Sequence, residues 1–216
     1  MYNIAIDGPA GAGKSTIAKI VAKELGFIYV DTGAMYRTIA LACFRAGIKA
    51  DESEKVIAKL DDIEVTLGYD NGTQKVYLNG EDVSLEIRRE EIGNMTSAIA
   101  VYEKVRENMQ RELAAKNDVV MDGRDIGTAV LPNADLKIYL TASSRTRAER
   151  RCKELVEKGV NCDIDTVEKD IIDRDYRDMH REISPLTQAE DAVLVDSSNM
   201  SIDEVVKEII KLKNER

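Results

Sequence analysis

Short apolar runs and longer amphipathic stretches alternate along most of the chain. Short runs that are apolar throughout are typical of strands buried on both faces of a parallel sheet. Five runs fit this description: residues 3–6, 27–31, 118–123, 136–141 and 192–197. Because amphipathic stretches separate them, we expect a five-stranded parallel sheet with helices on both faces, an α/β fold.

The amphipathic stretches predict the helices. In residues 14–25, Ile17, Val21 and Leu25 fall on one helical face, and Gly26 ends the helix. The same periodicity predicts further helices at residues 34–46, 100–116, 144–158, 163–182 and 201–213.

One section breaks this alternation. Residues 63–84 alternate apolar and polar positions with period two and contain the turn sequences "DNG" and "NG". Both features are typical of antiparallel hairpins. We therefore expect a small antiparallel β insertion packed on the parallel core.

Composition narrows the functional classes. The chain has 216 residues, 44% of them hydrophobic and 33% charged, with a net charge of −9. This is typical of one globular domain and argues against nucleic acid or an anionic membrane as partner, since both require a basic surface. There is neither an apolar run of the ~20 residues that a membrane helix needs nor a secretory signal. We expect a cytoplasmic protein, and the lack of a long heptad repeat makes a monomer the default.

The three cysteines are sparse and unpaired in the sequence. Cys43, Cys152 and Cys162 form no C-x-x-C pair, so they do not predict a metal site. An odd, scattered set is expected to remain as free thiols in a reducing compartment.

The most specific motif lies between the first predicted strand and the first predicted helix. It fits G-x-x-x-x-G-K-[ST], and its residues are Gly8, Pro9, Ala10, Gly11, Ala12, Gly13, Lys14 and Ser15. Glycines let backbone N–H groups turn around an anion, and the helix N-terminus adds its positive dipole. We expect this P-loop to bind the phosphates of a nucleoside triphosphate, with Lys14 on the β- and γ-phosphates, Ser15 on Mg²⁺ and Thr16 on a phosphate oxygen.

A P-loop specifies a nucleoside triphosphate, not a reaction. A regulatory GTPase would also carry N-K-x-D and D-x-x-G motifs, and neither is present. A motor or DNA-linked ATPase usually needs a larger core and a basic track. A small kinase needs a second anionic pocket and a mobile cover, so the positions of the arginines become decisive.

Nine arginines are candidates for that second pocket, because many of them follow strand ends, where ligands bind in open α/β sheets. They are Arg37, Arg88, Arg106, Arg124, Arg147, Arg150, Arg151, Arg174 and Arg181. A planar, bidentate guanidinium suits the spreading charge of phosphoryl transfer. For any single arginine a solvated surface charge is the alternative, and for residues 147–151 the alternative is a charged helix face. Asp122 ends a strand and could hold the water shell of Mg²⁺ or bond its own turn.

Several longer motifs occur in a fixed order: "GPAGAGKST", "DTGAMYR", "GEDVSLEIR", "DGRDIGTAVLPNAD", "KIYLTAS", "RAERR" and "DRDYRD" followed by "PL". Together they resemble the bacterial cytidylate kinases, within the nucleoside monophosphate kinases. The resemblance covers nearly the whole chain, and "DGRDIGT" with "DTGAMYR" is much more specific than the P-loop. One departure is Thr32, where the family often has serine; the hydroxyl is retained.

The resemblance implies transfer of the γ-phosphoryl group of ATP to CMP or dCMP with Mg²⁺. It implies catalytic roles for Lys14, Arg37, Arg124, Arg150 and Arg181, and ATP contacts from the P-loop, Arg150 and Arg151. Asp122 would hold Mg²⁺ through water, beside direct contact from Ser15. The implied CMP-binding residues are Thr32, Tyr36, Arg37, Arg88, Ser97, Arg106, Arg124, Asp125, Arg174, Asp178 and Arg181.

Within that set, Ser97, Arg106 and Asp125 would bind the base. The N4 amino group of cytosine can donate to a carboxylate such as that of Asp125, whereas uracil has an oxygen there. A site built to pair one group strongly rejects an analogue that lacks it.

The resemblance also divides the single domain into sub-regions. Residues 1–35, 117–143 and 183–216 would form the core, residues 36–116 the monophosphate-binding region, and residues 144–159 a lid that excludes water. Two alternatives remain open: another small kinase, of the dephospho-coenzyme A or shikimate type, and a nucleotide-binding regulatory module without transfer activity. The hairpin insertion and "DGRD" argue against the first, and the arginines with the complete Lys14–Ser15–Thr16 set argue against the second.

Overall fold

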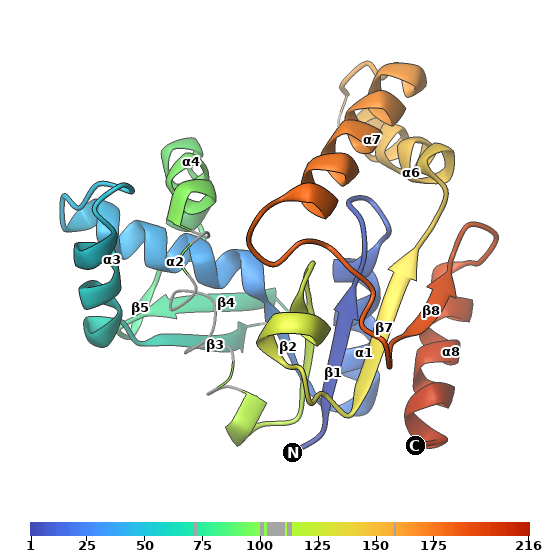
Figure 1. Ribbon diagram of the computed structural model, residues 1–216, viewed down its shortest axis with the longest axis horizontal. Coiled ribbons are helices and arrows are strands. Elements are labelled where there is room, and N and C mark those ends of the chain that lie inside the picture. The colour runs from blue at the N-terminus through green and yellow to red at the C-terminus, as the bar shows by residue number, and fades with distance from the viewer. Residues whose placement is uncertain (71–72, 100–101, 103–110, 112–113, 158) are drawn as a thin grey trace. The chain divides into compact units, whose positions relative to one another are not determined.

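The computed structural model describes residues 1–70, 73–99, 102, 111, 114–157 and 159–216. The chain forms two compact units. Unit 1 comprises residues 1–29 and 117–216, and unit 2 comprises residues 30–116. The P-loop lies in unit 1 and the antiparallel insertion in unit 2 (Figure 1).

The predicted five-stranded sheet is confirmed. Its strands are β1 (Asn3–Asp7), β2 (Ile28–Asp31), β6 (Val119–Asp122), β7 (Leu136–Thr141) and β8 (Val193–Asp196). The order across the sheet is β2-β6-β1-β7-β8. β1 pairs in parallel with β6 and β7, and β7 pairs in parallel with β8. β1 therefore lies at the centre, and its carboxyl end opens directly into the P-loop (Figure 1).

Two helices pack on this sheet and form the core of unit 1. They are α1 (Lys14–Leu25) and α8 (Ile202–Asn214), and they contact each other as well as the central strands. Ile17 and Val21 of α1 and Ile209 of α8 are buried there against β1 and β7. Gly26 ends α1 in a left-handed conformation, as its sequence position predicts. Burial of these apolar faces anchors the helix that begins at the P-loop.

The third part of unit 1 is a helix pair, α6 (Ser144–Glu157) and α7 (Ile164–His180), shown in Figure 1. It carries a correction to the sequence prediction: Cys152 and Cys162 form a disulfide, with 5.4 Å between their Cα atoms. Cys162 lies in the segment that precedes α7, and nothing in the spacing of the two cysteines reveals that they pair. Cys43 is a free thiol, as predicted, and it is buried.

We expect the disulfide to stabilise unit 1 measurably. It closes a loop with a sequence separation of 10 residues, and loop-closure entropy predicts that losing it lowers the free energy of unfolding by about 2–3 kcal/mol. The measurement is urea unfolding of the oxidised wild type against the Cys152→Ser/Cys162→Ser variant. Cys43→Ser is the control and should still respond to a reductant. Identical urea midpoints for oxidised and reduced wild type would contradict the expectation.

Unit 2 contains the predicted antiparallel insertion. It has three strands, β3 (Val65–Asp70), β4 (Thr73–Leu78) and β5 (Glu81–Asp82), in that order. They pack with α2 (Thr32–Arg45). Arg45, at the end of this helix, also forms ion pairs with Glu81 and Glu86. Unit 2 also has α3 (Ser53–Lys59), η1 (Leu60–Asp62), η2 (Glu86–Arg88) and α4 (Glu90–Ile99).

The other predicted helices appear within one or two residues of their expected ends, as α1, α2, α6, α7 and α8. Most of the predicted helix 100–116 lies outside the described residues. The pattern did not predict α3, α4, the 3₁₀ turns or the π-helix η3 (Ile126–Val130). In the part of the chain that the structure describes, no helix has the length and apolarity to cross a bilayer.

Candidate functional site

The P-loop connects the carboxyl end of β1 to α1, and close packing fixes its entry. Gly8 has φ 144°, and a Cβ atom there would lie 2.0 Å from the carbonyl oxygen of Leu140 in β7. Only glycine fits this position, because a side chain would collide with neighbouring backbone. The loop therefore begins pressed against the sheet.

The other end of the loop leaves backbone donors available. Gly13, at φ 86°, is the N-cap of α1, and no side chain caps this helix end. The first N–H groups of a helix have no partner within the helix, and together with the dipole they attract an anion. The geometry therefore suits the phosphate cradle that the motif predicts.

Lys14 is a buried amine in the first turn of α1. Its side chain is 6% exposed, and Nζ donates to the Pro9 carbonyl at 2.8 Å. The pKa of Lys14 is lowered to about 7, mainly by burial and then by the nearby Arg124, while the carboxylates of Asp122 and Asp7 oppose the change. The Lys14 side chain thus lies across the loop, where a polyphosphate would restore its charge.

Ser15 and Asp122 lie together at the carboxyl ends of the sheet. The Ser15 hydroxyl donates to Asp122 Oδ2 at 2.8 Å, and the Tyr29 hydroxyl donates to Asp122 Oδ1 at 2.7 Å. Both Asp122 oxygens are thereby oriented. Hydroxyl and carboxylate oxygens are the ligands that Mg²⁺ prefers, so this pair fits the predicted metal position.

Asp7 is a residue of the site that the sequence analysis did not identify. It ends β1, and its buried carboxylate accepts from the backbone N–H groups of Ile126 at 2.8 Å and Gly127 at 2.7 Å. Burial raises the pKa of Asp7, and these two bonds partly oppose the shift. Asp7 therefore holds the start of η3, and with it the "GRD" turn, beside the P-loop.

That turn delivers two of the predicted residues. Arg124 Nε donates to Asp178 Oδ2 at 2.8 Å, which joins the turn to α7. Asp125 is buried and faces Arg181 Nη2 at 3.6 Å, while Arg181 Nε donates to the Ser184 carbonyl. Within unit 1 the structure thus brings together four of the residues that were predicted to bind CMP: Arg124, Asp125, Asp178 and Arg181.

A cavity of about 660 Å³ opens in front of the P-loop. Its lining combines the loop and α1 with basic side chains, and includes the predicted Asp122, Arg124, Arg150 and Arg174. Residues from α6 and from the start of α8 complete it: Lys153, Glu154, Glu157, Ser197, Met200, Ser201, Ile202 and Val205. These were not predicted, although Lys153, Glu154 and Glu157 follow Arg150 at helical spacing.

The two arginines of α6 that were expected to contact ATP differ in position. Arg150 lines the cavity and donates to the Ser197 carbonyl at 2.6 Å and to its hydroxyl at 3.1 Å. Arg151 points elsewhere: it is exposed, pairs with Glu154 at 3.0 Å and is absent from the described cavity lining. The structure therefore brings one of the pair to the P-loop.

The remaining predicted residues belong to unit 2. Arg37 of α2 donates to the Ile87 carbonyl at 3.2 Å, next to Arg88 of η2, and its guanidinium lies beside Gly93 of α4. Thr32 is buried at the start of α2, and Tyr36 is half-buried. Ser97 belongs to α4, whose side chain there is not described, and Arg106 lies outside the described residues.

A parallel sheet, a P-loop opening from its central strand and a cavity lined with arginines define a P-loop nucleotide-binding protein of the kinase class. Comparison with solved structures agrees at the level of the fold. An uncharacterized protein from Eubacterium ventriosum has a TM-score of 0.53 and 15% identity, with both chains fully covered.

Comparison of sequences gives the family. The cytidylate kinase family model matches residues 4–215. A cytidylate kinase of Leuconostoc mesenteroides is 52% identical, covering 98% of this chain and 96% of the relative. Another from Streptococcus pneumoniae is 50% identical, covering 95% and 94%. The chain belongs to the cytidylate kinase family, as its motifs predicted.

Proposed function

We propose that the protein transfers the γ-phosphoryl group of ATP to CMP, and also to dCMP, giving ADP and CDP or dCDP. A phosphate oxygen of CMP forms the new bond to the γ-phosphorus as the bond to the β–γ bridging oxygen of ATP breaks. The observation that carries the proposal is the P-loop cavity of unit 1, lined by Arg124, Arg150 and Arg174, in a chain of this family.

In this reaction the residues of the P-loop bind and neutralise the donor. Backbone N–H groups of the loop and the Lys14 ammonium would meet the β- and γ-phosphates, and Arg150 would approach them from α6. Phosphoryl transfer needs chiefly positioning and charge stabilisation, so no general base is required of the chain. Residues 144–159, which include α6, would act as the lid that excludes water.

Mg²⁺ is the proposed metal. Ser15 would bind it directly and Asp122 through water, and the 2.8 Å bond between these side chains keeps the two oxygens together. Held there by Ser15 and Asp122, the metal would supply positive charge that neutralises the phosphates of ATP. Few protein ligands are needed, because Mg²⁺ usually retains several waters beside the phosphates.

The proposed CMP-binding residues are those that the resemblance to the family implies. We propose that Arg37, Arg124 and Arg181 bind its phosphate, with Arg88 close by, and that Arg174 and Asp178 lie near the ribose. Thr32 and Tyr36 would border the nucleotide, and Ser97, Arg106 and Asp125 would bind the base. ATP as donor is consistent with action in the cytoplasm, and we propose a monomer.

A coupled assay of ADP release tests the function. CMP should stimulate ATP consumption far more than UMP, AMP or shikimate do, and chelation of Mg²⁺ with EDTA should abolish the reaction until Mg²⁺ is restored. Stimulation by shikimate in place of CMP would favour the alternative small kinase. No stimulation by any of the acceptors would favour a nucleotide-binding module and would sink the proposal.

A further inference from the structure

Arg147 is an arginine of α6 that does not behave like its neighbours. The guanidinium is buried, with the side chain 6% exposed, whereas Arg145 and Arg151 are about half exposed. Among the described residues that line the cavity, Arg150 is present and Arg147 is absent. Arg147 therefore lies behind the P-loop rather than in front of it.

All three nitrogens of this guanidinium are engaged. Nη1 donates to the Ala10 carbonyl at 2.8 Å, Nε donates to the Ala142 carbonyl at 2.9 Å, and Nη2 pairs with Asp175 Oδ2 at 2.7 Å. The side chain also packs on the loop, since a Cβ atom at Gly11 would lie 3.4 Å from Arg147 Cβ. The guanidinium is therefore buried and held by three partners of the protein itself, which indicates a structural role for it rather than direct contact with a phosphate.

The contact with Ala10 determines the direction of a loop N–H group. The Ala10–Gly11 peptide is trans, so its C=O and N–H point in opposite directions. Because Arg147 holds the Ala10 carbonyl outward, the Gly11 N–H faces away from Arg147, on the side where Ala10, Gly11 and Ala12 line the cavity. Donors held in place before the ligand arrives cost no reorganisation when it binds.

Asp175 holds Arg147 in this position. It lies on α7, is buried, and uses Oδ2 for the ion pair; within the described residues its buried Oδ1 has no hydrogen-bond partner. A buried carboxylate with so few partners depends on its counter-charge. The pair therefore connects the back of the P-loop to α7.

We propose that Arg147 is a positioning residue for ATP binding: it fixes the Ala10–Gly11 peptide of the P-loop from behind, and Asp175 acts through it. This deepens the proposed function and rests on the P-loop binding ATP, but it does not depend on CMP being the acceptor.

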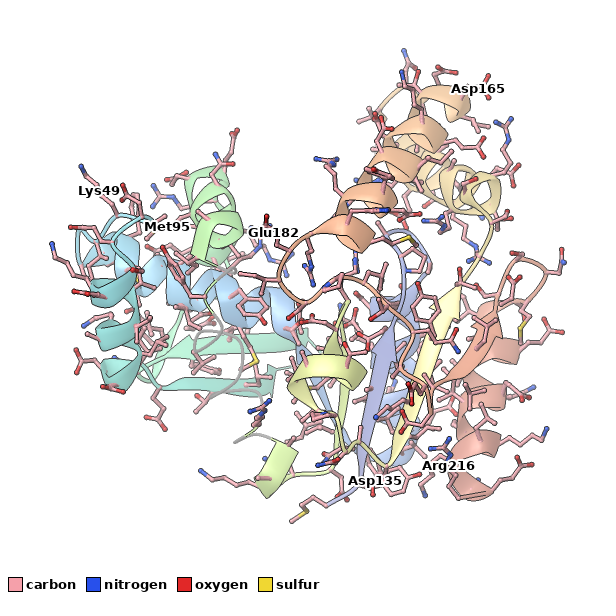
Figure 2. All side chains as sticks on the ribbon, viewed as in Figure 1. Lys49, Met95, Asp135, Asp165, Glu182 and Arg216 are labelled. Atoms are coloured by element: carbon pink, nitrogen blue, oxygen red, sulfur yellow. A yellow bond between two sulfur atoms is a disulfide. The ribbon has the colours of Figure 1, made fainter. Side chains whose placement is uncertain are left out.

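The chain offers a matched control on the same helix. Arg145 of α6 also bridges to α7, pairing with Asp165 at 2.6 Å and Glu168 at 3.1 Å. Asp165 lies at the outer end of the helix pair (Figure 2). Among the described residues, the ion pairs of Arg145 are with Glu149, Asp165 and Glu168, all of them on α6 or α7. Arg145→Met thus removes an α6–α7 tether of the same chemistry and leaves the loop alone.

The test is the dissociation constant of MgATP, measured by calorimetry without an acceptor. For Arg147→Met we expect it to rise about ten-fold or more, the scale of losing a buried charge-assisted bond. Arg145→Met should stay within about two-fold. The KM for ATP should rise more than the KM for CMP, because α7 keeps its bonds through Arg145 and Asp178.

The role of Asp175 is tested by combining variants. Asp175→Asn should weaken ATP binding less than Arg147→Met does, and the double variant should bind no worse than Arg147→Met alone, since Asp175 acts through Arg147. If Arg147→Met does not fold, Arg147→Lys keeps the charge without the fork and should still weaken ATP binding. Wild-type affinity in either folded Arg147 variant, or an equal loss in Arg145→Met, would overturn the proposal. Wild-type protein that binds ATP but fails to phosphorylate CMP would instead contradict the proposed function alone.

Discussion

Replacing Lys14 with methionine is expected to lower kcat/KM for phosphoryl transfer by about 10³-fold, the scale of losing one preorganised charge at a reacting phosphate. The side chain is 6% exposed and lies against Pro9 of the loop, so no water or other cation can readily take its place. Steady-state ADP release with saturating CMP measures the loss. Lys23→Met, an exposed change on the same helix, is the control and should remain within about two-fold of wild type.

The pH dependence distinguishes a direct role of Lys14 from a loss of folding. Burial lowers the pKa of Lys14 to about 7 without nucleotide, and a bound polyphosphate should raise it again. At pH 8, ATP binding should therefore take up close to one proton in the wild type and none at this position in Lys14→Met. Calorimetry in buffers of different ionisation enthalpy measures the uptake. Equal uptake in both proteins would show that Lys14 does not meet the phosphates.

The same shift has a defined sign for stability. The pKa of Lys14 lies near 7 in the folded protein and at 10.5 for an ordinary lysine. Between these values the unfolded chain holds the proton and the folded chain does not. Because of Lys14, the free energy of unfolding therefore rises as the pH increases from about 7 toward 10.5. The variant Lys14→Met should lack this contribution.

The sheet and the main helices could be predicted because short-range sequence patterns determine them. Continuous apolar runs and terminal glycines such as Gly26 act over a few residues. Helix α4 was missed because it contains Gly93, a poor helix former. Likewise, the pairing of Cys152 with Cys162 depends on where the fold places Cys162, in the segment that precedes α7.

The residues of the site likewise fall into those that local sequence predicted and those that it did not. The P-loop, Asp122 and Arg124 were predictable because motif and strand end coincide in sequence. Asp7 was not assigned a role, because a strand-end aspartate looks like a turn residue. Arg147 was one of the nine candidates for the second pocket, and that expectation was wrong: its guanidinium bonds the back of the P-loop and is absent from the described cavity lining. Their roles depend on partners 119 and 137 residues away, Ile126 for Asp7 and Ala10 for Arg147. Tertiary packing alone distinguishes a buried, fully bonded arginine from its exposed neighbours.

Replacing Asp125 with alanine is expected to lower the preference for CMP over UMP by about 10²-fold in kcat/KM, because a carboxylate that pairs with the cytosine amino group repels the uracil carbonyl. Asp125 is 6% exposed, so water cannot readily substitute for it. Asp125→Asn is the sharper variant, since its amide can donate to uracil O4 and should raise activity with UMP. The measurement is ADP release with each acceptor, and the dissociation constant of ATP should stay within about two-fold.

The neighbouring Arg181 makes the outcome informative. Its Nη2 lies 3.6 Å from Asp125, and its Nε is held separately by Ser184. If Asp125 served only to orient Arg181, its loss would weaken CMP and UMP equally, because Arg181 is proposed to bind the phosphate common to both. An unchanged ratio with lower activity toward both acceptors would therefore assign Asp125 to the phosphate. A collapsed ratio with ATP binding intact would assign it to the base.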